Sequence, residues 1–100
     1  MFRRKDRIEI KTAAQLEVMR AAGLVVGKTL LALREAVAPG ITTGQLDEIA
    51  RDSLATHRAT SSFLGYYGYP AVICASVNDE IVHGIPGSRV LHDGDQISID

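Results

Sequence analysis

The stretch Thr12–Gly40, TAAQLEVMRAAGLVVGKTLLALREAVAPG, decides how the chain begins to fold. Its apolar residues recur every three or four positions, the period of a helix with one buried face. The members of this stripe are Leu16, Met19, Gly23, Val26, Leu30, Leu33 and Val37. Thr12 and Gln15 have the spacing of a capping box at its start, and Pro39-Gly40 ends it. We therefore expect a helix of about six turns that packs on the core, with Gly23 admitting a close neighbour.

A second helix is expected soon after the first. Thr42 or Thr43 can cap it, and Gln45 has the position that completes a capping box. Asp47 and Glu48 in its first turn, and His57 and Arg58 in its last turn, suit the two ends of a helix dipole. The apolar residues again have helical spacing, and they are Leu46, Ile49, Ala50 and Leu54. Because only a few residues join the two helices, we expect them to form a helical hairpin.

From Ala71 onward the pattern is typical of β-strands. Ala71–Val77 is rich in small and β-branched residues, Asn78-Asp79 favours a turn, and Glu80–His83 continues extended, which predicts a hairpin. After a second turn at His92–Asp95, the segment Gln96–Asp100 alternates polar and apolar residues. We therefore expect an α+β fold in which two helices pack on an antiparallel sheet.

Length and composition exclude several classes of protein. One hundred residues suffice for one domain of ordinary size but not for two. The formal net charge of −1 argues against a protein dedicated to binding DNA. The single cysteine, Cys74, excludes an intrachain disulfide, and no apolar run approaches the roughly 20 residues of a membrane span. We expect a cytoplasmic protein with no DNA and no membrane partner.

Residues 59–70 have the composition of a loop, yet they hold four of the five aromatic residues of the chain. These residues are Phe63, Tyr66, Tyr67 and Tyr69. Aromatic side chains on a loop that contains glycine can line a pocket. The alternative, which the sequence leaves open, is that the tyrosines pin the loop to the core.

Three further residues could take part in chemistry. His83, between an apolar strand and a Gly-Ile-Pro-Gly turn, could exchange a proton near neutral pH, although a histidine at a strand end is more often structural. Cys74 lies among small residues in a strand, where a thiol is usually buried and inert. Asp100 ends an alternating strand on its polar face, where it could be solvated or hold a cation. One carboxylate does not make a metal site, because metals need several ligands.

The chain resembles the methionine aminopeptidases of bacterial type I over essentially its whole length from about residue 8. The segments that carry the resemblance are Glu9–Gly23, Val37–Thr43, Ser62–Pro70, Ile73–Pro86 and Leu91–Asp100. The resemblance implies the N-terminal half of a pita-bread (creatinase/aminopeptidase-like) fold. It makes residues 1–11 a basic arm and first short strand, and residues 12–100 the N-terminal part of a metallopeptidase catalytic domain.

The same resemblance implies an activity. Such enzymes remove the initiator methionine from nascent polypeptides by amide hydrolysis assisted by two divalent ions, here Fe, Mn, Co or Zn. By motif position, Asp100 would be a metal ligand, and His83 would bind the substrate beside the scissile amide. The pocket for the methionine side chain would be lined by Tyr66, Tyr69 and Cys74, with Phe63 at its edge, since a thioether favours aromatic and sulfur-bearing walls. We expect the enzyme to be a monomer.

Asp100 is the only metal ligand that the resemblance assigns in this chain. We therefore expect the sequence to be part of a longer enzyme, and the 100-residue chain alone to be inactive. The alternatives are a non-catalytic pita-bread protein that binds a partner and a proline-specific or creatine-cleaving relative. The basic arm, with Arg3, Arg4, Lys5 and Arg7, is interpreted as a solvated tail, and attraction to the phosphates of the ribosome is the alternative.

Overall fold

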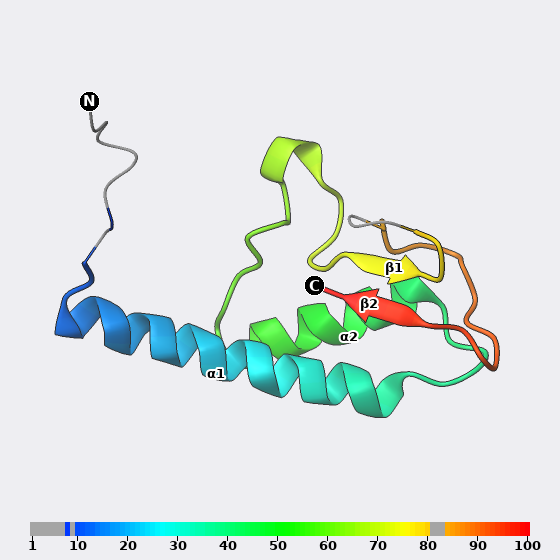
Figure 1. Cartoon of the computed structure of the whole chain (residues 1–100), viewed down its shortest axis with the longest axis horizontal. Helices are drawn as coiled ribbons and strands as arrows, with labels where there is room; N and C mark the ends of the chain where they lie inside the picture. The colour runs from blue at the N-terminus through cyan, green and yellow to red at the C-terminus, as the bar shows by residue number, and fades with distance from the viewer. Residues whose placement is uncertain (1–7, 9, 81–83) are drawn as a thin grey trace.

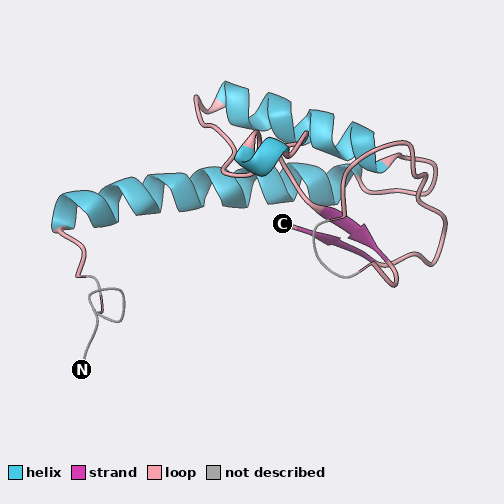
Figure 2. Ribbon diagram, turned by 90° about the horizontal axis from the view of Figure 1, so that it is seen from above, coloured by secondary structure: helices cyan, strands magenta, loops and turns pink. Residues whose placement is uncertain are grey.

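The computed structural model describes residues 8, 10–80 and 84–100, and it places two long helices beside a two-stranded sheet (Figure 1). In chain order the elements are α1 (Ala13–Ala36), α2 (Thr43–Thr56), the 3₁₀ turn η2 (Tyr66–Gly68), β1 (Ala75–Val77) and β2 (Ile97–Ile99). Figure 2 shows the two helices side by side, with the strands on one side of them. The expected α+β arrangement of two helices on an antiparallel sheet is confirmed.

Both helices begin at capping boxes, as the sequence predicts. The hydroxyl of Thr12 accepts a hydrogen bond from the backbone N–H of Gln15 at 3.1 Å, and the Gln15 side chain accepts one from Thr12 N at 2.8 Å. Thr42 and Gln45 repeat this arrangement with the same two distances, so Thr42 rather than Thr43 is the N-cap of α2. Each box satisfies N–H groups that would otherwise have no partner at the helix start.

The core lies between the C-terminal half of α1, helix α2 and the inner face of the strands. Its fully buried side chains are Leu33 of α1, Leu46 of α2 and Val77 of β1. Ile97 and Ile99 of β2 pack against the same cluster. The polar residues that alternate with them, Gln96, Ser98 and Asp100, are exposed, which confirms the predicted alternation.

The N-terminal half of α1 departs from the sequence prediction. The stripe predicts one buried face, but Thr29 and Leu33 are the only buried residues of this helix. Leu16 and Met19 are each 54% exposed, because the first half of α1 projects beyond α2 and the sheet (Figure 2). A Cβ added at Gly23 would meet nothing within 4 Å in the described chain, so the expected close neighbour is absent there. Core packing is thus correct around Leu33 and Val37 and wrong for the stripe before them, because Val26 and Leu30 are exposed as well.

The two strands join segments that lie far apart in the sequence. β1 pairs antiparallel with β2, with Ala75 opposite Ile99. Beyond the strands, the backbones of Cys74 and Asp100 exchange two hydrogen bonds of 2.9 and 3.0 Å. Residues directly opposite each other share one face of a sheet, so Cys74 and Asp100 lie together on the face opposite Ala75 and Ile99.

The hairpin expected from Ala71–Val77 and Glu80–His83 falls partly on residues 81–83, which lie outside the described residues. Its turn at Asn78-Asp79 is present, and the regular strand before it is limited to β1. Gly84 then crosses β1, and its carbonyl accepts a hydrogen bond from Ala75 N at 2.7 Å. A Cβ on Gly84 would collide with the backbone of Ala75, so the crossing requires glycine.

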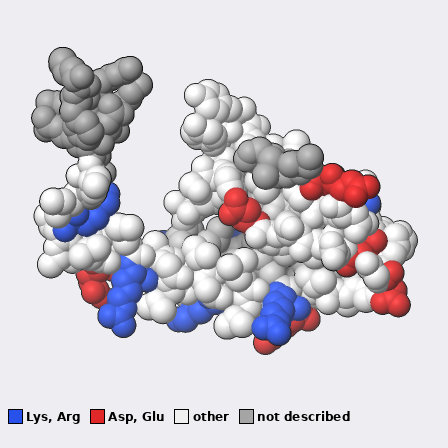
Figure 3. All heavy atoms as spheres, viewed as in Figure 1, with Lys and Arg blue, Asp and Glu red and all other residues white. Residues whose placement is uncertain are grey.

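Side-chain hydrogen bonds tie the two turns together at one end of the sheet. The Asn78 amide donates to the Asp95 carboxylate at 2.9 Å, and its oxygen accepts from Gln96 N at 3.0 Å. The bond from Asn78, followed by one from His92 N, holds the pKa of Asp95 below its ordinary value. Figure 3 shows acidic side chains gathered at this end of the molecule.

The connection between α1 and α2 forms backbone hydrogen bonds with the segment that precedes β2. Gly40 N donates to Leu91 O at 2.8 Å, Leu91 N donates to Ile41 O at 2.8 Å, and Thr42 forms an isolated bridge with Val90. These bonds hold the connection between the helices against the segment that leads into β2.

The basic arm lies largely outside the described residues, Arg3, Arg4, Lys5 and Arg7 among them. Of residues 1–11, the structure describes Ile8, Ile10 and Lys11, and these three have no regular secondary structure. In the described parts of the chain, no helix is long and apolar enough to cross a membrane.

Replacing Leu33 and Leu16 separately by alanine tests where α1 is buried. Leu33→Ala should lower the free energy of unfolding by about 2–5 kcal/mol, because it removes a side chain that is 1% exposed. Leu16→Ala, on the same stripe, should change it by about 0.5 kcal/mol or less, as a surface substitution does. Urea unfolding of this 100-residue chain, followed by circular dichroism, measures both, and equal losses would contradict the observed burial.

Candidate functional site

The candidate site lies at the end of the sheet where Cys74 and Asp100 pair. Cys74 is buried, whereas Asp100 is exposed on the same face. The two backbone hydrogen bonds between them fix the position of the Asp100 main chain relative to the thiol. The structure thus brings together two of the residues that the sequence singles out, although 25 residues lie between them in the chain.

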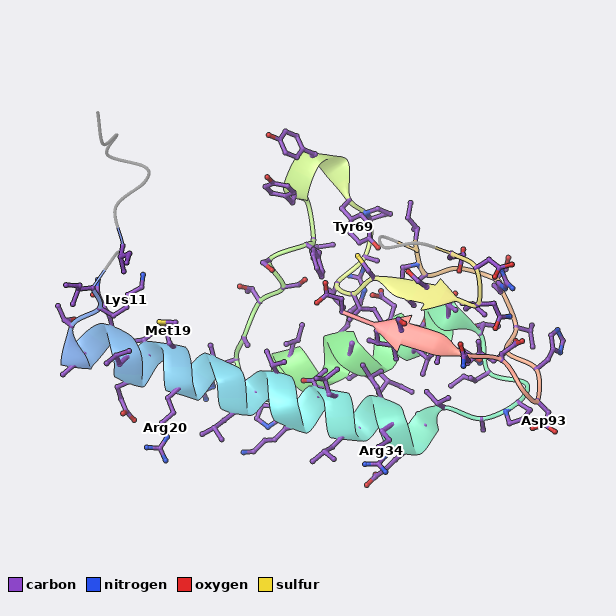
Figure 4. All side chains as sticks on the ribbon, viewed as in Figure 1. Lys11, Met19, Arg20, Arg34, Tyr69 and Asp93 are labelled. Atoms are coloured by element: carbon purple, nitrogen blue, oxygen red, sulfur yellow. The ribbon has the colours of Figure 1, made fainter. Side chains whose placement is uncertain are left out.

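Tyr69 lies next to this pair, beside β1 (Figure 4). Its hydroxyl donates a hydrogen bond to the carbonyl of Ile73 at 2.9 Å and lies 3.4 Å from the carbonyl of Gly84. Burial, followed by a hydrogen bond with Cys74, raises the pKa of Tyr69 above its ordinary value. The phenol is therefore neutral at physiological pH, and it links the aromatic loop to the segment just before β1.

The aromatic residues of the loop fall into two pairs. Phe63 packs near Tyr69 with ring centroids 6.0 Å apart, so Phe63, Tyr69 and Cys74 form one group. Tyr66 packs edge-on against Tyr67 at 4.5 Å, and Tyr66 is 65% exposed on η2. The structure therefore does not bring Tyr66 into the group around Tyr69.

A cavity of about 280 Å³ opens between α1, the loop at residues 60–63 and the end of β2. Its walls are chiefly apolar and include Leu30, Phe63 and Ile99, with Asp100 at the edge of the strand. Tyr66, Tyr69 and Cys74 do not line this cavity. The pocket expected from the sequence is thus not one enclosed space within the described residues.

His83 lies outside the described residues. The hypothesis that His83 and Asp100 face a common cleft therefore stays a prediction. Gly84, the residue that follows His83, is hydrogen-bonded to β1 through Ala75 and Ser76, which ties the chain on this side of His83 to the sheet.

Asp47 and Arg51 of α2 support the site, and the sequence interpretation missed this. Asp47 lies beyond the first turn of α2, so its interpretation as a helix-dipole residue is wrong. Its buried carboxylate instead accepts hydrogen bonds from the backbone of Val72 and Ile73 and from Arg51. The available signal was the pair of opposite charges at i and i+4, beside an apolar stripe that faces the core.

The residues that the structure describes do not form a complete metal centre. Among them, no three His, Cys, Asp or Glu side chains lie close enough together to hold an ion. Asp100 has the oxygen chemistry that divalent ions accept, but one carboxylate leaves the rest of a coordination sphere unfilled. A metal bound at Asp100 would need further ligands from outside this set.

Residues 17–100 match the metallopeptidase family M24, and the chain belongs to this family. It is 50% identical over 93 residues to the methionine aminopeptidase of Clostridium perfringens, a match that covers 93% of this chain and 37% of that relative. It is 54% identical over 91 residues to methionine aminopeptidase 1 of Mycobacterium tuberculosis, covering 90% of this chain and 34% of the relative.

A solved structure supports the same assignment. The crystal structure of methionine aminopeptidase from Rickettsia prowazekii matches with a TM-score of 0.89 and 36% identity, covering 94% of this chain and 38% of that one. The chain therefore has the fold of the corresponding part of a pita-bread enzyme, as the sequence predicts. It spans little more than a third of the length of these relatives.

The raised pKa of Tyr69 predicts a pH dependence of stability. The unfolded chain releases the phenol proton at about pH 10, whereas the folded chain holds it to higher pH. The stabilisation is therefore complete below about pH 10 and is lost as the pH rises toward the folded pKa. Tyr69→Phe should show a smaller loss of unfolding free energy between about pH 9 and 11. Urea titrations across this range measure it, and identical slopes for the two proteins would contradict the assignment.

Proposed function

We propose that this chain is part of an enzyme that removes the N-terminal methionine from nascent polypeptides by metal-dependent amide hydrolysis. One observation carries the proposal: the carboxylate-bearing Asp100 is paired with Cys74, beside Tyr69, at one end of the sheet. Membership of a metallopeptidase family and 50–54% identity to enzymes named methionine aminopeptidase support it.

Asp100 is proposed as one ligand of a site for two divalent ions, of Fe, Mn, Co or Zn. Bound ions of this kind activate a water molecule and polarise a carbonyl group. The exposed position of Asp100 leaves its carboxylate accessible to a metal ion. His83 is proposed to donate a hydrogen bond to the substrate near the scissile amide, without binding metal.

The group around Tyr69 is proposed to recognise the methionine side chain. Phe63 and Tyr69 offer ring surfaces, and Cys74 offers sulfur, which suit a polarizable thioether. The hydroxyl of Tyr69 donates its hydrogen bond to the carbonyl of Ile73, so an apolar ligand would not meet an unpaired phenol there. Tyr66 lies on η2, outside the group around Tyr69, and is proposed to contribute to the methionine pocket from that position.

The partners of such an enzyme are new polypeptide N-termini, and the compartment it implies is the cytoplasm. We propose a monomer. Attraction of Arg3, Arg4, Lys5 and Arg7 to ribosomal phosphate remains a secondary proposal. Charge reversal at these four positions should lower salt-dependent ribosome affinity of the full-length enzyme, and unchanged affinity would remove that proposal.

The role of Asp100 can be tested in the full-length protein that carries this chain. Release of methionine from methionyl peptides, in the presence of added divalent ions, should fall by more than about 100-fold in Asp100→Asn, because the loss of a direct ligand exceeds the effect of outer-shell changes. Asp93→Asn is the matched control, since Asp93 lies on a turn far from Tyr69 (Figure 4). It should retain wild-type turnover.

Two results would overturn the proposal. One is a wild-type protein that releases no methionine with any of the four ions, and the other is equal turnover in Asp100→Asn and Asp93→Asn. The 100-residue chain alone should give no turnover, because its described residues form no complete metal centre. Turnover by that chain alone would contradict the assignment of ligands outside it.

A further inference from the structure

Asp47 is the only charged side chain that is buried among the described residues. Its Oδ1 accepts hydrogen bonds from Val72 N at 2.8 Å and from Ile73 N at 3.2 Å, and its Oδ2 accepts one from Arg51 Nε at 2.9 Å. Hydrogen bonds to a carboxylate are stronger than those between neutral groups. These three bonds compensate for the cost of removing the carboxylate from water.

Arg51 adds a further hydrogen bond between α2 and segment 70–73. Its Nη2 donates to the carbonyl of Pro70 at 3.0 Å while its Nε binds Asp47. From the other side, the hydroxyl of Ser61 donates to the carbonyl of Val72 at 2.7 Å. The segment 70–73 has no regular strand pairing of its own, so these side chains supply its hydrogen bonds.

This segment lies between the parts of the candidate site. The carbonyl of Ile73 accepts the hydroxyl of Tyr69, while the N–H of the same residue binds Asp47. Cys74 follows directly and exchanges its two backbone hydrogen bonds with Asp100. Asp47 on α2 is therefore connected to the Tyr69 hydroxyl through the backbone of Ile73. The next residue, Cys74, continues this connection to the main chain of Asp100.

We infer that Asp47 is a positioning residue, whose carboxylate holds segment 70–73 so that Tyr69, Cys74 and Asp100 keep a fixed arrangement. The inference rests on the proposed function for the roles of those three residues. Asp47 is buried, and it acts through the backbone that it binds. An apolar side chain would fill the same space, but it would leave the N–H groups of Val72 and Ile73 buried without acceptors.

Hydrogen–deuterium exchange in the full-length protein tests the inference. In Asp47→Ala, the backbone amides of Cys74 and Asp100 should exchange at least about tenfold faster than in the wild type, since their hydrogen-bonded support is removed. The amide of Asn78, which binds Gln96 at the far end of the same strand pair, should accelerate clearly less. Asp52→Asn is the matched control, because Asp52 is an exposed carboxylate on the same helix, and it should change neither end.

The exchange rates of the isosteric variant Asp47→Asn provide a second test. Its amide oxygen can still accept from Val72 or Ile73, but its NH2 group cannot accept from Arg51, so exchange should lie between wild type and Asp47→Ala. This variant decides the question if Asp47→Ala does not fold. Equal acceleration at both ends of the strand pair would show general destabilisation and overturn the inference. Rates equal to those of Asp52→Asn would also overturn it.

Kinetics connect the arrangement to the reaction. With peptides that carry N-terminal methionine, kcat/KM of Asp47→Asn should fall at least about tenfold below that of Asp52→Asn, at a temperature where both are folded. Unchanged kcat/KM would overturn the positioning role. The exchange experiment needs no catalysis, so an inactive wild type would remove the proposed function and leave the structural part of the inference to be judged on exchange alone.

Discussion

The antiparallel pairing of β1 with β2 is the interaction on which the arrangement of the site depends. Each strand has only three residues, and a two-stranded ribbon of this length is not stable in water by itself. The ribbon is stabilised on its inner face, where Val77 and Ile99 pack against the hydrophobic cluster that includes Leu33 of α1 and Leu46 of α2. The same pairing sets Cys74 opposite Asp100, so helix packing indirectly determines where the carboxylate lies.

Local features of this fold could be predicted from the sequence, whereas contacts between distant segments could not. A capping box needs only two side chains three residues apart, and Thr42 with Gln45 satisfies that condition without any tertiary contact. The partner of β1 is 22 residues away, and alternation in Ile97–Ile99 indicates which face is apolar but not which strand is adjacent. The exposure of Leu16 was likewise missed, because periodicity shows that a face is apolar and does not show that anything covers it.

The candidate site shows the same division. The resemblance identified Tyr69, Cys74 and Asp100, and the structure places these three together. Tyr66 belongs to the same motif, yet the left-handed backbone of Tyr67 at φ 48° turns the chain so that these two rings pack on each other. The positioning role of Asp47 could not be predicted from the spacing of residues in the sequence. Its hydrogen-bond partners are backbone N–H groups, which every non-proline residue possesses.

The uncovered first half of α1 has a consequence for how this chain behaves while it is being made. The ridge that contains Leu16 and Met19 leaves the ribosome early, and the described residues that follow it, up to Asp100, leave it open to water. Exposed apolar ridges of this kind drive clustering of incomplete chains and attract holdase chaperones. The ridge around Leu16 and Met19 should therefore be the part of this chain through which it associates with other apolar surfaces.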